Sequence, residues 1–94
     1  GPTASAGTRV TAADFPPAAG LPPACEDFRK AMVRLAVCPA YPAEAGAAFK
    51  DSWATMRSAW TDVSTMPASA QQAIGETCQQ GTESLAGAIS AMQC

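Results

Sequence analysis

The stretch FKDSWATMRSAWTDV, residues 49–63, carries the clearest pattern in this chain of 94 residues. Its large apolar side chains recur at intervals of four, three, four and three residues, at Phe49, Trp53, Met56, Trp60 and Val63. Side chains with this spacing lie on one face of an α-helix. We expect the helix to run from Pro42 to Thr65, since proline suits the first helical turn. The stripe is interpreted as core, with a ligand pocket lined by the two tryptophans as the alternative.

The same periodicity appears upstream of this stretch. It predicts a helix from Pro23 to Val37, which Pro39 ends because the residue before a proline avoids the helical region. The apolar face of this helix is formed by Cys25, Phe28, Met32 and Leu35.

Downstream of the stretch, apolar and small residues repeat with heptad spacing and predict a third helix, from Pro67 to the C-terminus. Its three glycines each weaken it by about 1 kcal/mol relative to alanine. They also leave room for a close neighbour. These glycines are Gly75, Gly81 and Gly87.

The chain is long enough for one domain, but a domain of this size is marginally stable without cross-links. Four cysteines, Cys25, Cys38, Cys78 and Cys94, can supply them. Zinc sites favour closely spaced cysteine pairs and histidine, and the sequence has neither, so we expect two disulfides and no metal. Disulfides persist in oxidising compartments, which predicts a secreted, periplasmic or outer-surface protein.

The predicted helices select one disulfide pairing. Short connections predict an all-α, three-helix, up-down-up bundle, in which the first and third helices are parallel. With Cys38 at height zero, the helical rise puts Cys25 about 20 Å up, Cys78 at about 18 Å and Cys94 about 5 Å below zero. A disulfide needs a Cα separation of about 4.4 to 6.8 Å. We therefore predict the bonds Cys25–Cys78 and Cys38–Cys94.

Residues 1–22 are rich in proline and alanine and predict a flexible tether to a domain of residues 23–94. Phe15 and Leu21 are the exceptions, and we expect them to be able to dock on the body. The first helix is shorter than the second, so one side of the hairpin formed by the second and third helices is left uncovered. The segment from Phe15 to Leu21 is the candidate cover, and otherwise this surface is the best place for a partner.

The net charge of −2 argues against a nucleic-acid partner, which requires a basic face. No apolar run is long enough to cross a bilayer. The opening Gly1-Pro2 is typical of a scar left by removal of an expression tag, so a precursor with a signal sequence or lipid anchor stays open.

Catalytic groups are sparse. The sequence contains no histidine, which excludes serine–histidine and cysteine–histidine arrangements. Ser52 and Lys50 are two residues apart and so point to different faces of their helix. No glycine-rich phosphate loop is present. We expect neither an enzyme nor a cofactor.

Four residues are candidates for contact with a partner. Tyr41 lies in the connection between the first two helices, where we weigh three roles: covering the end of the bundle, recognising a partner, or acting as an axial haem ligand. Arg29, Lys30 and Arg34 form a small basic strip. By its height, Arg29 is expected near Glu83 of the third helix.

The layout of two cysteines around a first helix, tryptophans on a second and two more cysteines on a third resembles uncharacterised small envelope proteins of bacteria. The residues that carry it are Cys25, Cys38, Trp53, Trp60, Cys78 and Cys94. The resemblance covers about the last three quarters of the chain. It implies an envelope location and assigns no functional residue.

Three functions follow as hypotheses. The first is a non-catalytic, exported module that binds another protein or has a structural role in the cell envelope. The second is a carrier of a small apolar ligand between the helices, which requires a cavity of several hundred Å³. The third is a small secreted toxin or inhibitor.

Overall fold

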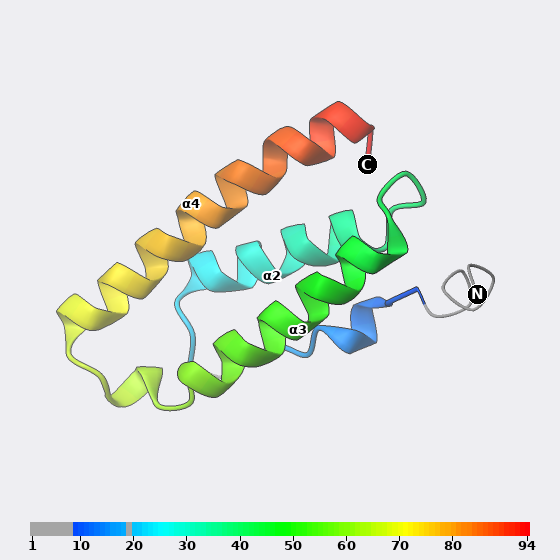
Figure 1. Cartoon of the computed structure of the whole chain (residues 1–94). Helices are drawn as coiled ribbons and strands as arrows, with labels where there is room; N and C mark the ends of the chain where they lie inside the picture. Colours follow the sequence, from blue (N-terminus) through cyan, green and yellow to red (C-terminus); the bar gives the residue numbers. More distant parts are fainter. Residues whose placement is uncertain (1–8, 19) are drawn as a thin grey trace.

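The computed structural model describes residues 9–18 and 20–94, and within them the regular structure is entirely helical. Three α-helices follow an N-terminal segment that contains one short 3-10 helix, η1, Ala12–Asp14 (Figure 1). This confirms the predicted all-α, three-helix fold.

Helix α2, Pro23–Ala36, lies in the middle of the molecule and packs against both other α-helices, most extensively against α4 (Figure 1). Pro22 caps it and Pro23 occupies its first turn, where a missing N–H costs no hydrogen bond. Arg34 lies in its last turn, where a positive charge faces the negative end of the helix dipole. The helix ends one residue before the predicted Val37.

Helix α3, Ala43–Ala59, is shorter than predicted. The expected helix ran to Thr65, but Trp60 leaves the helical conformation, and the chain continues through a second 3-10 helix, η2, Val63–Thr65. The residues after Trp60 are threonine, aspartate, valine and serine, which are poor helix formers. The break turns Val63 inward, where it is fully buried.

Helix α4, Ala68–Met92, is the longest element. It ends at Gln93, whose left-handed backbone (φ 56°) lets the N–H of Cys94 donate to the carbonyl of Ile89. This closure is typical of helix C-termini, although glycine usually occupies the left-handed position.

One disulfide joins the start of α2 to the middle of α4, and the other joins the residues that follow the C-caps of these two helices. Cys25 bonds to Cys78 with a Cα separation of 4.8 Å, and Cys38 to Cys94 with a separation of 5.8 Å. The predicted pairing is confirmed. Two bonds in the same order along both helices fix α2 and α4 side by side and parallel.

The N-terminal segment packs on the body. Residues 1–8 of the predicted tether lie outside the described residues, but Val10 and Phe15 are buried, and Leu21 packs against the core. Gly20 has a left-handed backbone (φ 81°), a conformation that suits glycine, and it lies next to Ser64. The chain then reaches α4, where Pro22 lies against Gly75. Phe15 and Leu21 therefore dock on the body, which the sequence had allowed, and Val10 and Ala18 of the predicted tether also contact the core.

Hydrogen bonds from three side chains hold this segment in place. The indole Nε1 of Trp53 donates to the carbonyl of Pro16 at 2.7 Å, and Nη1 of Arg29 donates to the carbonyl of Phe15 at 2.9 Å. At the start of the segment, Nη1 of Arg9 donates to two carbonyls of the connection between α2 and α3. The first two bonds pair the Phe15 and Pro16 carbonyls of a proline-rich segment that has few N–H groups of its own to donate.

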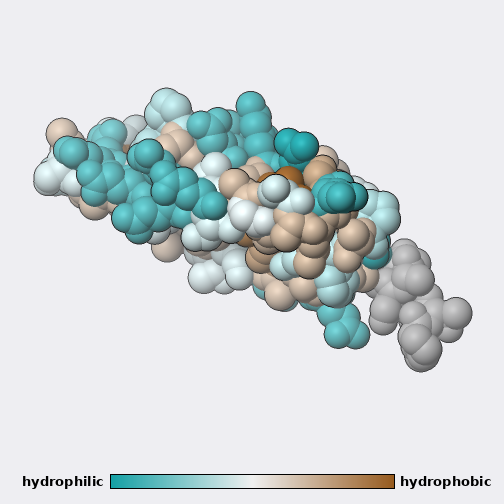
Figure 2. Space-filling model, turned by 90° about the horizontal axis from the view of Figure 1, so that it is seen from above, coloured by the Kyte–Doolittle hydropathy of each residue, from teal (hydrophilic) through white to brown (hydrophobic). Residues whose placement is uncertain are grey.

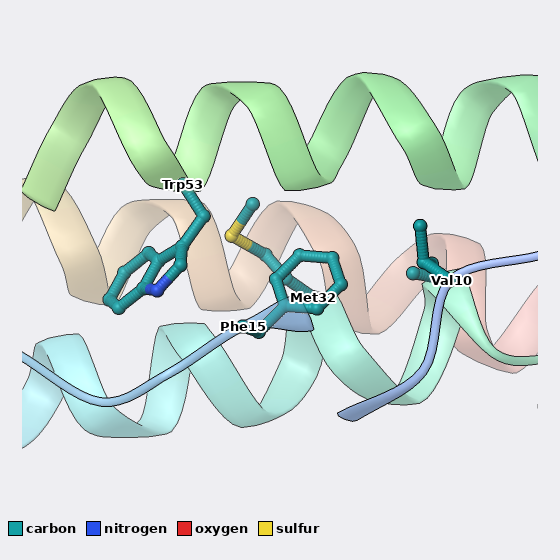
Figure 3. Packing of buried hydrophobic residues seen from close by; sticks show 5 residues of the cluster. Val10, Phe15, Met32 and Trp53 are labelled. Atoms are coloured by element: carbon teal, nitrogen blue, oxygen red, sulfur yellow. The ribbon is translucent and has the colours of Figure 1, made fainter. Parts of the chain in front are cut away.

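The core lies where α2, α3 and the N-terminal segment meet. Figure 3 shows Phe15 of the segment next to Met32 of α2, with Trp53 of α3 close by and Val10 farther along the core. Trp53 is a core residue as predicted, whereas Trp60 is half-buried. Within the described part of the chain, no helix is long and apolar enough to span a membrane.

Candidate functional site

An open groove of about 600 Å³ lies beside this core, between α3 and α4. Its floor is formed by Phe28 and Met32 of α2, and Met32 is almost completely buried. One wall is a stretch of α3 that begins at Phe49 and ends at Met56, and the other is formed by Leu85 of α4.

The α3 wall is built by helical periodicity. Phe49 and Met56 are seven residues apart, so they lie on the same face, two turns or about 10.5 Å from each other. Both are half-buried. The apolar side chains of residues 49–63 therefore lie in two environments. Trp53 is buried in the core, while Phe49 and Met56 line the groove.

The opposite wall depends on the disulfides and on one glycine. The bond between Cys25 and Cys78 brings the start of α2 to the middle of α4. One turn further along α4, Gly81 has no side chain, and the Phe28 ring lies directly over it. The ring occupies the position that a side chain at residue 81 would need, and it contributes to the groove floor instead.

The groove is apolar with a polar edge on α3. Phe28, Phe49, two methionines and Leu85 supply the apolar surface, and methionine adapts its shape readily to different ligands. Asp51, Ser52 and Thr55 form the polar edge. Thr55 donates its hydroxyl to the backbone carbonyl of Asp51 at 3.1 Å, so the Asp51 carboxylate is the main polar feature offered to a ligand.

A second hollow of about 370 Å³ lies where the N-terminal segment meets the end of α3. It is more polar, and its lining residues are Ala18, Ala54, Arg57, Ser58, Trp60 and Thr61. The Nε of Arg57 is buried and has no hydrogen-bond partner among the described residues. Because this atom is inaccessible to solvent, a ligand in the hollow does not reach it either.

Tyr41 covers the end of the bundle, the first of the roles expected for it. Its ring stacks on Phe49 with 5.4 Å between the centroids, and its backbone carbonyl accepts a hydrogen bond from Arg9. The ring is half-buried and supports Phe49, a wall residue of the groove. Contact of Tyr41 with a partner stays a prediction.

The structure separates the three residues of the basic strip. The guanidinium of Arg29 pairs with Glu26 of its own helix, not with Glu83 of α4 as expected from its height. The reason is local: residues three apart on a helix are neighbours, and Arg29 also reaches the carbonyl of Phe15. The hydrogen bond from Arg29 lowers the pKa of Glu26. Arg29 is therefore largely committed to the fold.

The other two residues of the strip are exposed. Nε of Arg34 donates to the Cys94 carbonyl at 3.1 Å and so links α2 to the C-terminus. Lys30 is exposed on the same helix. Their contact with a partner stays a prediction, and neither lines the groove.

The sequence predicted an uncovered apolar surface on the hairpin of the second and third helices, but not the position of this groove or the residues that line it. Phe28, Phe49, Met56 and Leu85 carry the helical periodicity of core residues, and periodicity does not reveal whether another helix covers them. The difference in helix length predicts uncovered surface beyond the end of the first helix, whereas the groove lies alongside α2, whose Phe28 and Met32 form its floor. Among the described residues, no group of three or more potential metal ligands comes together. The sequence matches no protein-family model, no curated protein and no solved structure.

Proposed function

We propose that this chain is a non-catalytic, exported binding module that receives part of another protein in the groove between α3 and α4. The observation that carries the proposal is an apolar groove whose floor and α4 wall are held together covalently. A groove that exists before binding loses less conformational entropy on binding than one that has to form.

The proposed export rests on the two disulfides, which support an oxidising compartment because disulfides persist there. A secreted, periplasmic or outer-surface location is the finer part of the proposal. The resemblance to small envelope proteins of bacteria points the same way.

The groove is a better candidate than the basic strip. Arg29 is occupied by Glu26 and by the N-terminal segment, and exposed lysine and arginine side chains contribute little binding energy. The groove offers half-buried aromatic, methionine and leucine side chains at one place. Such desolvated apolar clusters provide most of the binding energy in protein interfaces.

Site-specific crosslinking tests the proposal in the organism that makes the protein. A photoreactive amino acid at position 55, on the polar edge of the groove, is compared with one at position 47, an exposed residue of the same helix that does not line the groove. We expect one protein partner to be crosslinked from position 55 and not from position 47. Crosslinks of equal yield from both positions would place the partner elsewhere.

A second candidate is a carrier of a small apolar ligand. The groove volume of about 600 Å³ favours it, since ligand pockets commonly have 300 to about 1,000 Å³. Native mass spectrometry of the purified protein distinguishes the two candidates. A carrier retains an apolar adduct that disappears when Thr55→Trp fills the groove, whereas the binding module has the mass of the bare chain.

A further inference from the structure

We infer that the occupant of the groove is an amphipathic α-helix of a partner protein, with a lysine or arginine beside its apolar stripe. The inference rests on the proposed function, because it specifies the chemistry of the partner at the same site. It follows from the shape, the length, the helical surroundings and the charge of the groove.

The shape of the groove favours a ligand that is apolar on one side only. The groove is open to solvent along its length, with Met32 buried at its floor and Thr55 exposed at its edge. A free acyl chain in such an open groove leaves part of its apolar surface in water. An amphipathic helix buries its apolar stripe and keeps its polar face in solvent.

The length of the groove matches two turns of helix. The α3 wall extends from Phe49 to Met56, about 10.5 Å along the helix axis. An apolar stripe with residues at positions i, i+3 or i+4, and i+7 has the same span. Three anchoring side chains of a partner helix therefore fit side by side against this wall.

The arrangement of the helices also favours a helical occupant. Helix α2 packs between α3 and α4, and the groove lies between these two outer helices (Figure 1). An added helix in the groove would lie on the open side and complete a four-helix arrangement. Four-helix bundles bury the apolar stripe of each helix in this way.

The charge of the groove selects for a basic side chain. Asp51 is the one ionised side chain among the residues that line it, and no lysine or arginine does so. A lysine or arginine at the edge of the partner's stripe would pair with Asp51, whereas an acidic residue there would be repelled.

A second copy of this chain is a poor occupant. Among the described residues, the large apolar side chains that are exposed are Val37 and Met92, each 37% exposed. They lie on different elements and form no helical stripe. Figure 2 shows that hydrophobic residues gather toward one end of the face seen from above, while hydrophilic residues dominate the other end.

Selection from a displayed library of random 16-residue peptides, with the disulfide-bonded protein as bait, tests the inference. We expect the enriched peptides to share apolar residues at i, i+3 or i+4, and i+7, with lysine or arginine beside them. The chain contains four methionines, which report the site directly. In NMR spectra of the protein labelled with ¹³C at the methionine methyl groups, a selected peptide should shift Met32 and Met56 and leave Met66 and Met92 unchanged.

Matched variants locate the contacts. Thr55→Trp, which fills the groove, should weaken binding of the selected peptide by more than about tenfold. Ala47→Trp, exposed on the same helix, should leave binding unchanged. Asp51→Lys should weaken binding of a basic peptide by about fivefold, the scale of an exposed ion pair. Glu83→Lys, with the same charge change on the exposed surface of α4, should not.

The other outcomes separate the two proposals. Selected peptides that shift Met32 and Met56 but are proline-rich or extended would overturn the helical occupant and leave the groove as the binding site. Concentration-dependent shifts of the same two methyl groups without peptide would assign the groove to a second copy and overturn the inference. If no enriched peptide affects either methyl group, the helical occupant and the proposed function both fail.

Discussion

The aromatic ring of Phe28 lies directly on Gly81, so that a side-chain carbon added at residue 81 would come within 2.5 Å of the ring. The contact joins α2 to α4 next to the disulfide between Cys25 and Cys78, and it sets the position of a ring that lines the groove. Gly81 is therefore favoured inside α4 because it leaves room for the Phe28 ring, and this packing outweighs the low helix propensity of glycine.

The first prediction compares two glycines of α4. Gly81→Ala should destabilise the protein by about 1 to 3 kcal/mol, because the Phe28 ring has to move and overpacking outweighs the gain in propensity. Gly87→Ala meets no atom within 4 Å and should stabilise by up to about 1 kcal/mol. Urea denaturation followed by circular dichroism measures both. Equal stabilisation by the two variants would show that the ring does not occupy this position.

The second prediction concerns the N-terminal segment. Phe15→Ala should lower the free energy of unfolding by about 3 to 5 kcal/mol, because Phe15 is fully buried against the core. Pro17→Ala, in the same segment but exposed, is the control and should lower it by no more than about 1 kcal/mol, the entropic contribution of a proline to the unfolded state. Both variants are compared by chemical denaturation. If the segment is a free tether, Phe15→Ala will behave like the control.

The third prediction concerns the disulfides. The two bonds span similar sequence separations, 53 and 56 residues, and the chain-entropy model assigns each about 4 kcal/mol. Removal of Cys25–Cys78 by double alanine substitution should cost more than removal of Cys38–Cys94, because both of its cysteines are fully buried, whereas Cys94 is half-buried. Thermal unfolding measures the order. A lower melting temperature for the variant without Cys38–Cys94 would contradict it.

The fourth prediction is a dependence of stability on pH. The hydrogen bond and charge of Arg29 lower the pKa of Glu26 below its ordinary value of 4.5. A carboxyl whose pKa is lower in the folded state stabilises the protein above its unfolded pKa. It loses this contribution as the pH falls through the folded pKa. The wild-type protein should therefore lose stability below about pH 4.5 through this pair.

The size of this effect is limited by solvent, since the Glu26 side chain is 40% exposed, and we expect less than about 1 kcal/mol. Glu26→Gln should remove this part of the acid-induced loss, as measured by denaturation between pH 3 and pH 7. Glu83→Gln, which removes the same charge from the exposed surface of α4, should retain it. Identical pH profiles of Glu26→Gln and the wild-type protein would exclude a contribution from the Arg29 pair.

The disulfide pairing could be derived from the sequence because it depends on a single length. The rise of a helix is nearly constant, so the positions of Cys25, Cys38, Cys78 and Cys94 along three helices determined which pairs are close. An error of a turn in the helix ends shifts these heights by about 5 Å, which is small beside the height difference of about 25 Å between Cys25 and Cys94 that rules out the crossed pairing. The predicted end of α3 at Thr65 was wrong by six residues, or nearly two turns, since the helix ends at Ala59, and the pairing was insensitive even to this error.

The partners of Arg29 were not predictable in this way. Its height along the bundle is compatible with Glu83, but a guanidinium chooses among all acceptors within reach of a long side chain. Glu26, one turn away, and the carbonyl of Phe15 are within reach once the N-terminal segment is packed. The burial of Val10 could not be predicted either, because it also depends on the packing of the N-terminal segment. The composition of that segment is typical of a linker.

The sequence by itself determined the helices, their apolar faces and the disulfide pairs, because periodicity and helical rise are local properties of the chain. It indicated only that Phe15 and Leu21 were able to dock. Only the tertiary structure decided which apolar residues are covered. Trp53 and Met56 belong to the same stripe, but the N-terminal segment covers the first, and the separation of α3 from α4 leaves the second at the groove. Whether an apolar side chain is covered depends on how the neighbouring elements cross and where they end. The position of a residue in a helical repeat gives no information about either.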